Sequence, residues 1–290
     1  MNKQIQNNSE ILFIYDAKNC NPNGDMDNEN KPRMDYDTNT NLVSDVRLKR
    51  YIRDYLNKFK EKEIFIKRTN KDVTSDKRAK ELEKNNIDWK TLIDVKLFGG
   101  IVTIKTQTDN LTGPVQFNWG YSLNNVELLE SKTITSTFKT SGKAENTGGS
   151  GIGKDYRVKY SFIAFSGSIN KKVAEETKLT EEELKLLDEA MINSIQLCRT
   201  RSKIGQSPRL YLRVVMKDNK TLNDLREYIT LEKTDELTSI EDVILNVSEL
   251  KKYLEENKDK IEKIILWKDS KLKFNEEFEV GEIEIEELNS

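Results

Sequence analysis

The sequence predicts an α+β fold in which two helices pack on one sheet. Short apolar runs typical of β-strands occur in four places, and two longer segments repeat their apolar residues every three or four positions, as helices do. In chain order the segments predict strand, helix, strand, strand, helix, strand, over residues 10–16, 44–60, 101–106, 157–169, 181–198 and 209–216.

Each predicted element has a local signal. The first strand, 10–16, is an apolar run that ends in a loop rich in Asn, Pro and Gly. Ser44 is a suitable N-cap for the first helix, whose apolar residues from Leu48 to Phe59 share one face. Thr180, followed three residues later by Glu183, has the spacing of a capping box for the second helix. The remaining segments alternate or are continuously apolar, which is typical of strands.

This order of elements is that of a ferredoxin-like or RRM-like domain (βαββαβ). Two insertions interrupt it, at about 61–97 and 110–156. The second insertion contains a segment rich in Gly, Ser and Asn, 141–154, which predicts a loop or the tip of a hairpin. Towards the end of the chain we expect a helix near 247–265 and a strand-like alternation from Val280 to Ile285.

The composition excludes several kinds of chemistry. None of the 290 residues is histidine, so the chain alone builds no Ser-His-Asp triad, Cys-His pair or His-ligated zinc site. Its two cysteines, Cys20 and Cys198, lack a CxxC partner, which favours a reducing compartment and inert thiols. There is no apolar run of about 18 residues and no signal-peptide core, so we expect a soluble cytoplasmic protein.

The net charge of −2 conceals an asymmetry along the chain. Residues 218–290 hold 11 basic and 21 acidic side chains, a net charge of −10. Subtraction leaves 37 basic and 29 acidic side chains for residues 1–217, a net charge of +8. The near-neutral total is therefore compatible with a polyanionic partner for the first 217 residues.

Two basic clusters are candidate phosphate contacts. On the first helix, Lys49, Arg50 and Arg53 form a stripe beside the apolar face, and Arg47 lies on the other flank; such a stripe tracks phosphates or is simply solvated. Basic residues also crowd the segment 198–209, where a helix C-terminus explains part of the charge. A third set is aromatic and either stacks on bases or packs in the core: Phe117, Trp119 and Tyr121.

Acidic side chains in the loops suggest metal sites only weakly. Asp25, Asp27 and Glu29 resemble the start of a calcium loop, but the Gly and the final Glu of that motif are absent at the required offsets. Asp16, Asp25 and Asp35 are candidates for a two-metal nuclease site. Aspartates in loops are more often turn formers, so we predict no metal and no cofactor.

The chain resembles the backbone subunit of type I CRISPR Cascade, a member of the RAMP superfamily, and most closely its subtype I-B branch. The resemblance covers about residues 1–216 and is carried by the segments 11–25, 30–33, 42–54, 94–100, 113–120 and 200–203. It implies a modified RRM-like palm with finger and thumb insertions. The implied division is palm over 1–60, fingers or web over 61–130, a thumb loop over 131–156, and the second part of the palm with an acidic C-terminal extension over 157–290.

The resemblance implies a non-catalytic subunit, several copies of which line up along one CRISPR RNA as a helical filament. The implied partners are this RNA, target DNA through the guide, further copies of the chain and other Cascade subunits, with no membrane. A subunit that accepts any guide must contact phosphate and ribose rather than base edges. The expected RNA contacts are Asn19, Asn21, Asn23, Arg33, Arg47, Lys49, Arg50, Arg53, Gln116, Trp119, Lys154, Arg157, Arg199, Arg201 and Lys203.

Two other functions remain open from the sequence. A subunit of the type III kind would cut target RNA with a loop aspartate and a divalent metal, and Asp16, Asp25 or Asp35 would be that aspartate. A free monomeric RRM-like protein would instead bind RNA sequence-selectively, although the stacking aromatics usual in that domain are not evident.

Overall fold

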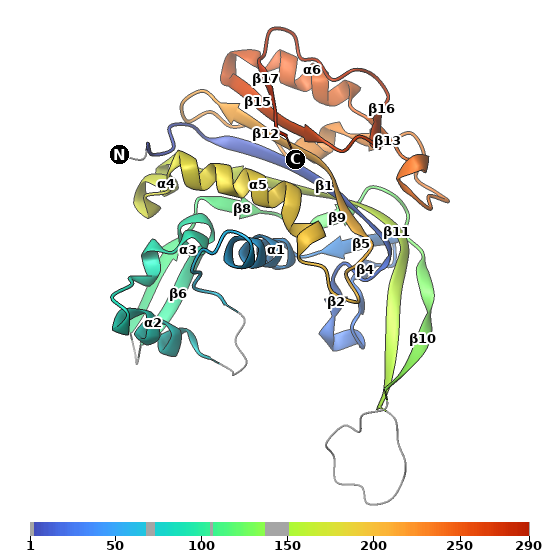
Figure 1. Ribbon diagram of the computed structural model, residues 1–290. Coiled ribbons are helices and arrows are strands. Elements are labelled where there is room, and N and C mark those ends of the chain that lie inside the picture. The colour runs from blue at the N-terminus through green and yellow to red at the C-terminus, as the bar shows by residue number, and fades with distance from the viewer. Residues whose placement is uncertain (1–2, 68–72, 105–106, 137–150, 290) are drawn as a thin grey trace, which may run out of the picture.

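The structure is a computed structural model that describes residues 3–67, 73–104, 107–136 and 151–289. Its centre is one large sheet with the strand order β17-β15-β12-β1-β11-β9-β5-β4, with β8 and β10 also paired to β11 (Figure 1). The strands of this sheet are β1 (Ser9–Cys20), β4 (Met34–Asp35), β5 (Thr40–Val43), β8 (Val115–Phe117), β9 (Gly120–Ser122), β10 (Leu128–Ser136), β11 (Gly151–Ile169), β12 (Gln206–Met216), β15 (Ile261–Lys268) and β17 (Ile285–Glu287).

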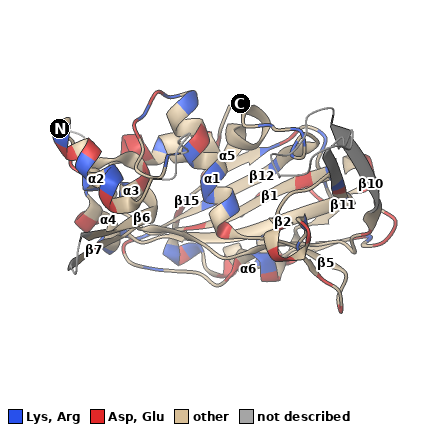
Figure 2. Ribbon diagram, turned by 90° about the horizontal axis from the view of Figure 1, so that it is seen from below, with Lys and Arg blue, Asp and Glu red and all other residues tan. Residues whose placement is uncertain are grey.

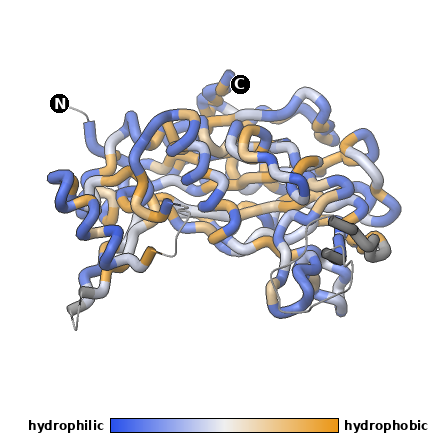
Figure 3. The backbone as a smooth tube through the Cα atoms, turned by 60° about the horizontal axis from the view of Figure 1, so that its bottom comes forward, coloured by the Kyte–Doolittle hydropathy of each residue, from blue (hydrophilic) through white to orange (hydrophobic). Residues whose placement is uncertain are grey.

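Strand β1 lies in the middle of the sheet and is covered on both faces. It pairs antiparallel with β11 and with β12. Phe13 and Tyr15 pack in the core cluster shared with the helices, whereas Leu12 and Ile14 pack with the C-terminal part of the chain. A strand buried on both faces has no polar side to alternate with, which explains its continuous apolar run. Figure 3 shows hydrophobic stretches running through these central strands.

The helix layer and the C-terminal layer lie on opposite faces of the sheet (Figure 1). The helix layer contains α1 (Asp45–Lys58), α4 (Lys171–Thr177) and α5 (Glu181–Leu197). The opposite layer contains α6 (Ser248–Glu256) and a small sheet of β13 (Thr230–Leu231), β14 (Ile244–Asn246) and β16 (Lys273–Phe274). The acidic C-terminal region is thus a folded layer of the protein.

Both main helices begin where their capping residues predict. The Ser44 hydroxyl accepts a hydrogen bond from the backbone N–H of Arg47, and Thr180 and Glu183 form the predicted capping box. The predicted helices 44–60 and 181–198 are therefore confirmed to within two residues at each end.

The predicted third element of the sheet is wrong. Residues Gly99–Ile104 do form a strand, β6, but it pairs with β7 (Gln107–Thr112) in a separate two-stranded sheet. The places beside β11 are taken by β8 and β9 instead. Ile101 is exposed and Val102 is buried, so β6 alternates because only one face of its hairpin packs against the protein. β8 and β9 have three residues each, too few for their alternation to stand out.

The predicted helix over 247–265 is also wrong in its second half. Helix α6 ends at Glu256, and residues 261–268 form β15, which pairs antiparallel with β12. Ile261, Ile264 and Ile265 fit a helical period, yet β-branched side chains favour strands. The alternation expected from Val280 to Ile285 is a strand only at its last residue, where β17 (Ile285–Glu287) begins and runs parallel to β15.

Three smaller units surround the sheet. Segment 63–112 contains α2 (Ser75–Lys84), α3 (Ile93–Phe98) and the β6–β7 hairpin, and has its own small core around Trp89. The β10–β11 hairpin is paired as far as Ser136 and Gly151 and projects from the sheet (Figure 1). The predicted tip at 141–154 falls mostly outside the described residues. A ribbon of β2 (Gly24–Asp25) and β3 (Lys31–Pro32) follows β1. Among the described residues, no helix has the length and apolar content needed to cross a membrane.

Candidate nucleic-acid interface

A basic cavity lies between α1 and the loop 198–205, which joins α5 to β12. Its volume is about 490 Å³, and six of its lining side chains are basic whereas one, Asp54, is acidic. Figure 2 looks onto the helix layer and shows the basic residues of α1. The lining residues are Arg47, Arg50, Asp54, Asn57, Lys58, Ile64, Lys67, Leu197, Cys198, Arg199, Thr200, Ser202 and Lys203.

The arginines of α1 that line this cavity differ in how far they are neutralised. The Arg47 guanidinium lies 3.9 Å from the centre of the Tyr51 ring, and its buried Nε has no hydrogen-bond partner within the described structure. Arg50 donates to Asp54 at 2.6 Å, a pair one helical turn apart. Arg47 is therefore held in place by an aromatic ring and keeps its full charge for a ligand, while Arg50 is partly compensated.

The loop 198–205 is tied to the loop that follows β1. The Lys203 ammonium donates to the backbone carbonyls of Asn21, at 2.5 Å, and Pro22, at 3.1 Å. Burial, together with the nearby Arg47, lowers the pKa of Lys203 to about 7. Gly205 has a φ of +108°, and a Cβ there would lie 2.3 Å from the carbonyl oxygen of Lys18. Only glycine allows this close return of the chain into β12.

Two of the three asparagines predicted as RNA contacts are occupied within the protein. The buried Asn21 donates to the carbonyl of Asn30 at 2.8 Å. Asn23 accepts from the backbone N–H and the hydroxyl of Ser44, the N-cap of α1, at 2.8 and 2.9 Å. Asn19 is exposed and adopts a left-handed φ of 51°. The loop therefore fixes the start of α1 and leaves only Asn19 open to a ligand.

Three further predicted contacts meet at the base of the β10–β11 hairpin. Arg157 donates to Asp155 with both Nε, at 3.0 Å, and Nη2, at 2.9 Å, and Arg201 reaches the same carboxylate at 3.3 Å. Lys154 pairs with Glu29 at 2.7 Å. The hairpin base is thus rich in cations, and each of these three already has a carboxylate partner.

The remaining predicted residues lie in two other places. Lys49 is buried and donates to Asp45 at 3.0 Å and to Gln116 at 3.2 Å. Arg33 lies 5.9 Å from the centre of the Trp119 ring, and Trp119 is 42% exposed. The structure therefore brings Lys49 and Gln116 together and places Arg33 beside an accessible aromatic face. Arg53 lies beside the first group, because it shares the Phe98 ring with Lys49, and it is buried against Asp94.

Two of the three candidate stacking aromatics pack within the protein and one is exposed. Phe117 is buried, and the half-buried Tyr121 ring lies 4.5 Å from the guanidinium of Arg226. Both rings pack within the protein, and Trp119 is the exposed member of the three.

The three candidate metal-binding aspartates are held by separate partners. Asp16 is buried, and burial raises its pKa even though Arg209 and Tyr160 bind its carboxylate at 3.0 and 3.1 Å. Asp25 pairs with Arg33 at 3.2 Å. Asp35 accepts hydrogen bonds from Asp37 and Thr38 within its own turn. No group of three potential metal ligands occurs among the described residues.

Both cysteines are free in the structure. Burial raises the pKa of Cys20 to about 12 and that of Cys198 to about 11. Neither thiol is therefore a nucleophilic thiolate at neutral pH, in agreement with the predicted inert role.

Sequence reasoning missed several residues of this region. Lys58 and Lys67 line the cavity, but Lys58 lies at the end of α1 and Lys67 lies in the first predicted insertion. Glu29 and Asp155, which neutralise predicted contacts, were not recognised either. The helical period itself could have indicated Lys58, because it lies about three turns beyond Arg47 on the same side of α1, whereas the others depend on tertiary contacts.

The geometry defines a mixed α+β protein whose helix face carries a basic cavity. Residues 7–248 match the family model described as CRISPR-associated protein Cas7. A CRISPR-associated protein Cas7 from Haloferax volcanii is 32% identical over 306 aligned positions, which cover 93% of this chain and 89% of the relative. The chain therefore belongs to the Cas7 family, as its resemblance to Cascade backbone subunits predicts.

Solved structures of low sequence identity share the fold. One, described as a CRISPR RNA-guided surveillance complex, pre-nicking, contains a chain with a TM-score of 0.56 and 14% identity, covering 98% of this chain and 96% of that one. A second CRISPR RNA-guided surveillance complex has a TM-score of 0.54 and 16% identity, with 98% and 95% covered. At these identities the likeness concerns the fold alone.

Proposed function

We propose that this chain is a non-catalytic subunit that binds CRISPR RNA through its sugar-phosphate backbone and lines up with further copies along one guide. The cavity beside α1, with six basic side chains against one carboxylate, carries this proposal. A cluster of Lys and Arg holds phosphates without reading bases, and every guide has phosphates. Membership of the Cas7 family supports it, since the similar solved chains belong to RNA-guided surveillance complexes.

The proposed palm is a modified RRM-like domain. The order β12-β1-β11 with β8 and β9 beyond, and with α1 and α5 packed on one face, corresponds to the 4-1-3-2 order expected of βαββαβ. β8 and β9 belong to this sheet, so the proposed fingers end before Val115 rather than at 130. The paired β10–β11 hairpin is the proposed base of the thumb.

We assign the RNA contacts in two groups. The first group lines the cavity: Arg47, Arg50, Arg199 and Lys203. The second lies at the hairpin base and the neighbouring exposed loops: Asn19, Arg33, Trp119, Lys154, Arg157 and Arg201. Among the other predicted residues, Asn21, Asn23 and Lys49 support the loop and α1 from within the protein, and the exposed Gln116 accepts a hydrogen bond from Lys49.

The proposed partners are the guide RNA, target DNA paired to it, further copies of the chain and other subunits of a type I complex, with subtype I-B as the expected branch. The proposed compartment is the cytoplasm, where guide and target meet. The acidic C-terminal layer, which lies on the sheet face opposite α1, is available to protein partners rather than to RNA.

The test begins with the protein purified with its bound nucleic acid. We expect it to carry RNA of one discrete length and to leave guide-complementary RNA intact in the presence of Mg²⁺. Regularly spaced cuts in that RNA would contradict the non-catalytic role and favour the metal-dependent nuclease of the type III kind. Purification without RNA, together with no affinity for added guide, would contradict RNA binding itself.

A further inference from the structure

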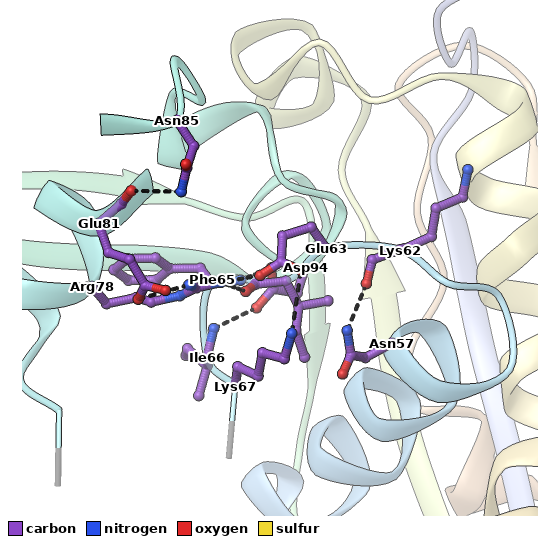
Figure 4. A network of polar contacts seen from close by, with 11 residues as sticks. Asn57, Lys62, Glu63, Phe65, Ile66, Lys67, Arg78, Glu81, Asn85 and Asp94 are labelled. Atoms are coloured by element: carbon purple, nitrogen blue, oxygen red, sulfur yellow. Dashed lines mark hydrogen bonds and ion pairs between the residues drawn. The ribbon is translucent and has the colours of Figure 1, made fainter. Parts of the chain in front are cut away.

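A buried carboxylate lies where the finger segment meets the palm, that of Asp94 in the first turn of α3. Asp94 has no exposed surface. Its Oδ1 accepts from the backbone N–H of Phe65 at 2.8 Å, and its Oδ2 accepts from that of Ile66 at 3.0 Å (Figure 4). Arg53, on α1, completes the set by donating from Nε to Oδ2 at 3.2 Å. One side chain thus joins three parts of the protein.

Helix α3 spans the boundary between two cores at this point. Leu97 and Phe98 pack in the core shared with α1 and α5, whereas Val95 packs with Trp89 in the small finger core. The Arg53 guanidinium lies 5.1 Å from the centre of the Phe98 ring. A movement of α3 would therefore disturb both cores, and the Asp94 carboxylate lies at the junction.

The segment held by Asp94 also forms a wall of the basic cavity. Ile64 and Lys67 line the cavity, and they flank the two residues whose N–H groups Asp94 accepts. Arg78 supports the same segment from α2 by donating to the carbonyl of Ile64 at 2.9 Å (Figure 4). The position of Lys67 at the cavity therefore depends on contacts made by its neighbours.

Arg53 cannot neutralise Asp94 and contact RNA at the same time. It is 6% exposed, and burial lowers its pKa although the Asp94 carboxylate opposes this. A buried carboxylate without a counter-charge is strongly destabilising, so the pair persists only while both members remain.

We propose that Asp94 and Arg53 are positioning residues for the guide cavity: together they hold the finger segment 64–67 against α1 and so place its finger-side wall. This rests on the proposed RNA-binding function of the cavity. It assigns Arg53, predicted from the helical stripe as a phosphate contact, to the joint between fingers and palm.

The test compares Arg53→Met, Asp94→Asn and the double variant in the full chain. For Arg53→Met we expect weaker guide binding and a salt slope lower by about 0.7, because the displaced Lys67 no longer contacts a phosphate. Asp94→Asn added to it removes the stranded charge and should recover at least half of the lost affinity on a logarithmic scale. The matched control is Arg50→Met. It should lower the salt slope by about 0.7, and adding Asp94→Asn should not restore its affinity.

A second measurement separates positioning from general destabilisation. Lys67→Gln should lower the salt slope by about 0.7 in the wild type and have no further effect in Arg53→Met, where Lys67 is displaced. Additive effects of the two substitutions, or a slope that falls in Arg53→Met without rescue, would overturn the proposal.

Thermal unfolding of the wild type, Arg53→Met, Asp94→Asn and the double variant tests the Arg53–Asp94 contact without RNA. We expect the double variant to be more stable than Arg53→Met, and the absence of this coupling would refute the joint. A wild type that does not bind RNA would refute the proposed function while the unfolding comparison still decides the joint. If Arg53→Met does not fold, Arg53→Gln serves in its place, because it also removes the charge and leaves the Asp94 carboxylate without a counter-charge.

Discussion

Neutralising the cavity should reduce the salt dependence of RNA binding by an amount that the structure sets. Arg47, Arg50 and Arg199 line the cavity from α1 and from the loop that follows α5. For single-stranded nucleic acid each phosphate contact contributes about 0.7 to the slope of log affinity against log salt. The triple change to Gln should therefore lower the slope by about 2. Between 50 and 200 mM salt this is about an 18-fold smaller loss of affinity than in the wild type.

The assay is fluorescence anisotropy with a labelled guide-length RNA over a series of salt concentrations. The matched control removes the same charge from exposed lysines of the C-terminal region, by changing Lys220, Lys252 and Lys258 to Gln. We expect the control to keep the wild-type slope to within a few tenths. An unchanged slope in the cavity variant, or an equal fall in the control, would refute the assignment of phosphates to this cavity.

Three further predictions concern single residues. Burial lowers the pKa of Lys203 to about 7, so RNA affinity should fall from pH 6 to pH 8, and Lys203→Gln should flatten that anisotropy profile. Asp155→Asn should raise RNA affinity a few-fold by releasing the two arginines it holds, and a lower affinity would instead mean that Asp155 orients them. Burial raises the pKa of Glu10 from 4.5 to about 7 in the folded protein. Its contribution to stability is therefore full below pH 4.5 and lost as the pH rises through 7, and Glu10→Gln should remove that part of the decline in denaturant titrations.

The local signals in the sequence were sufficient for the elements with strong periods and caps. The Ser44 cap and the Thr180 capping box determine where α1 and α5 begin, because these bonds form within four residues. The apolar run of residues 10–16 predicted the central strand, and the cover on both faces of β1 explains why that run is continuous. Which strands join the main sheet, in contrast, is not determined by local sequence. β6 shows the clearer strand pattern, yet the three-residue β8 pairs with β11, because tertiary packing decides which strand joins the sheet.

The site residues show the same division between local and tertiary information. A helical wheel places Arg50 and Arg53 on one basic stripe, but it carries no information about what packs against that stripe. Asp94 lies 41 residues further along the chain and buries Arg53, whereas Arg50 remains at the cavity. From the sequence, Asn23 is a polar loop residue. The structure shows that it accepts hydrogen bonds from Ser44, the N-cap of α1. Charge pattern thus predicts the basic face, and the packing determines which cations remain free.

The central claim is that copies of this chain bind a guide through its backbone, whatever the guide sequence. Native mass spectrometry of the protein with RNAs of increasing length, in two unrelated sequences, tests it most directly. We predict that the number of bound copies rises in equal steps with RNA length and is the same for both sequences. A single copy at every length, or a stoichiometry that follows the sequence rather than the length, would contradict the claim.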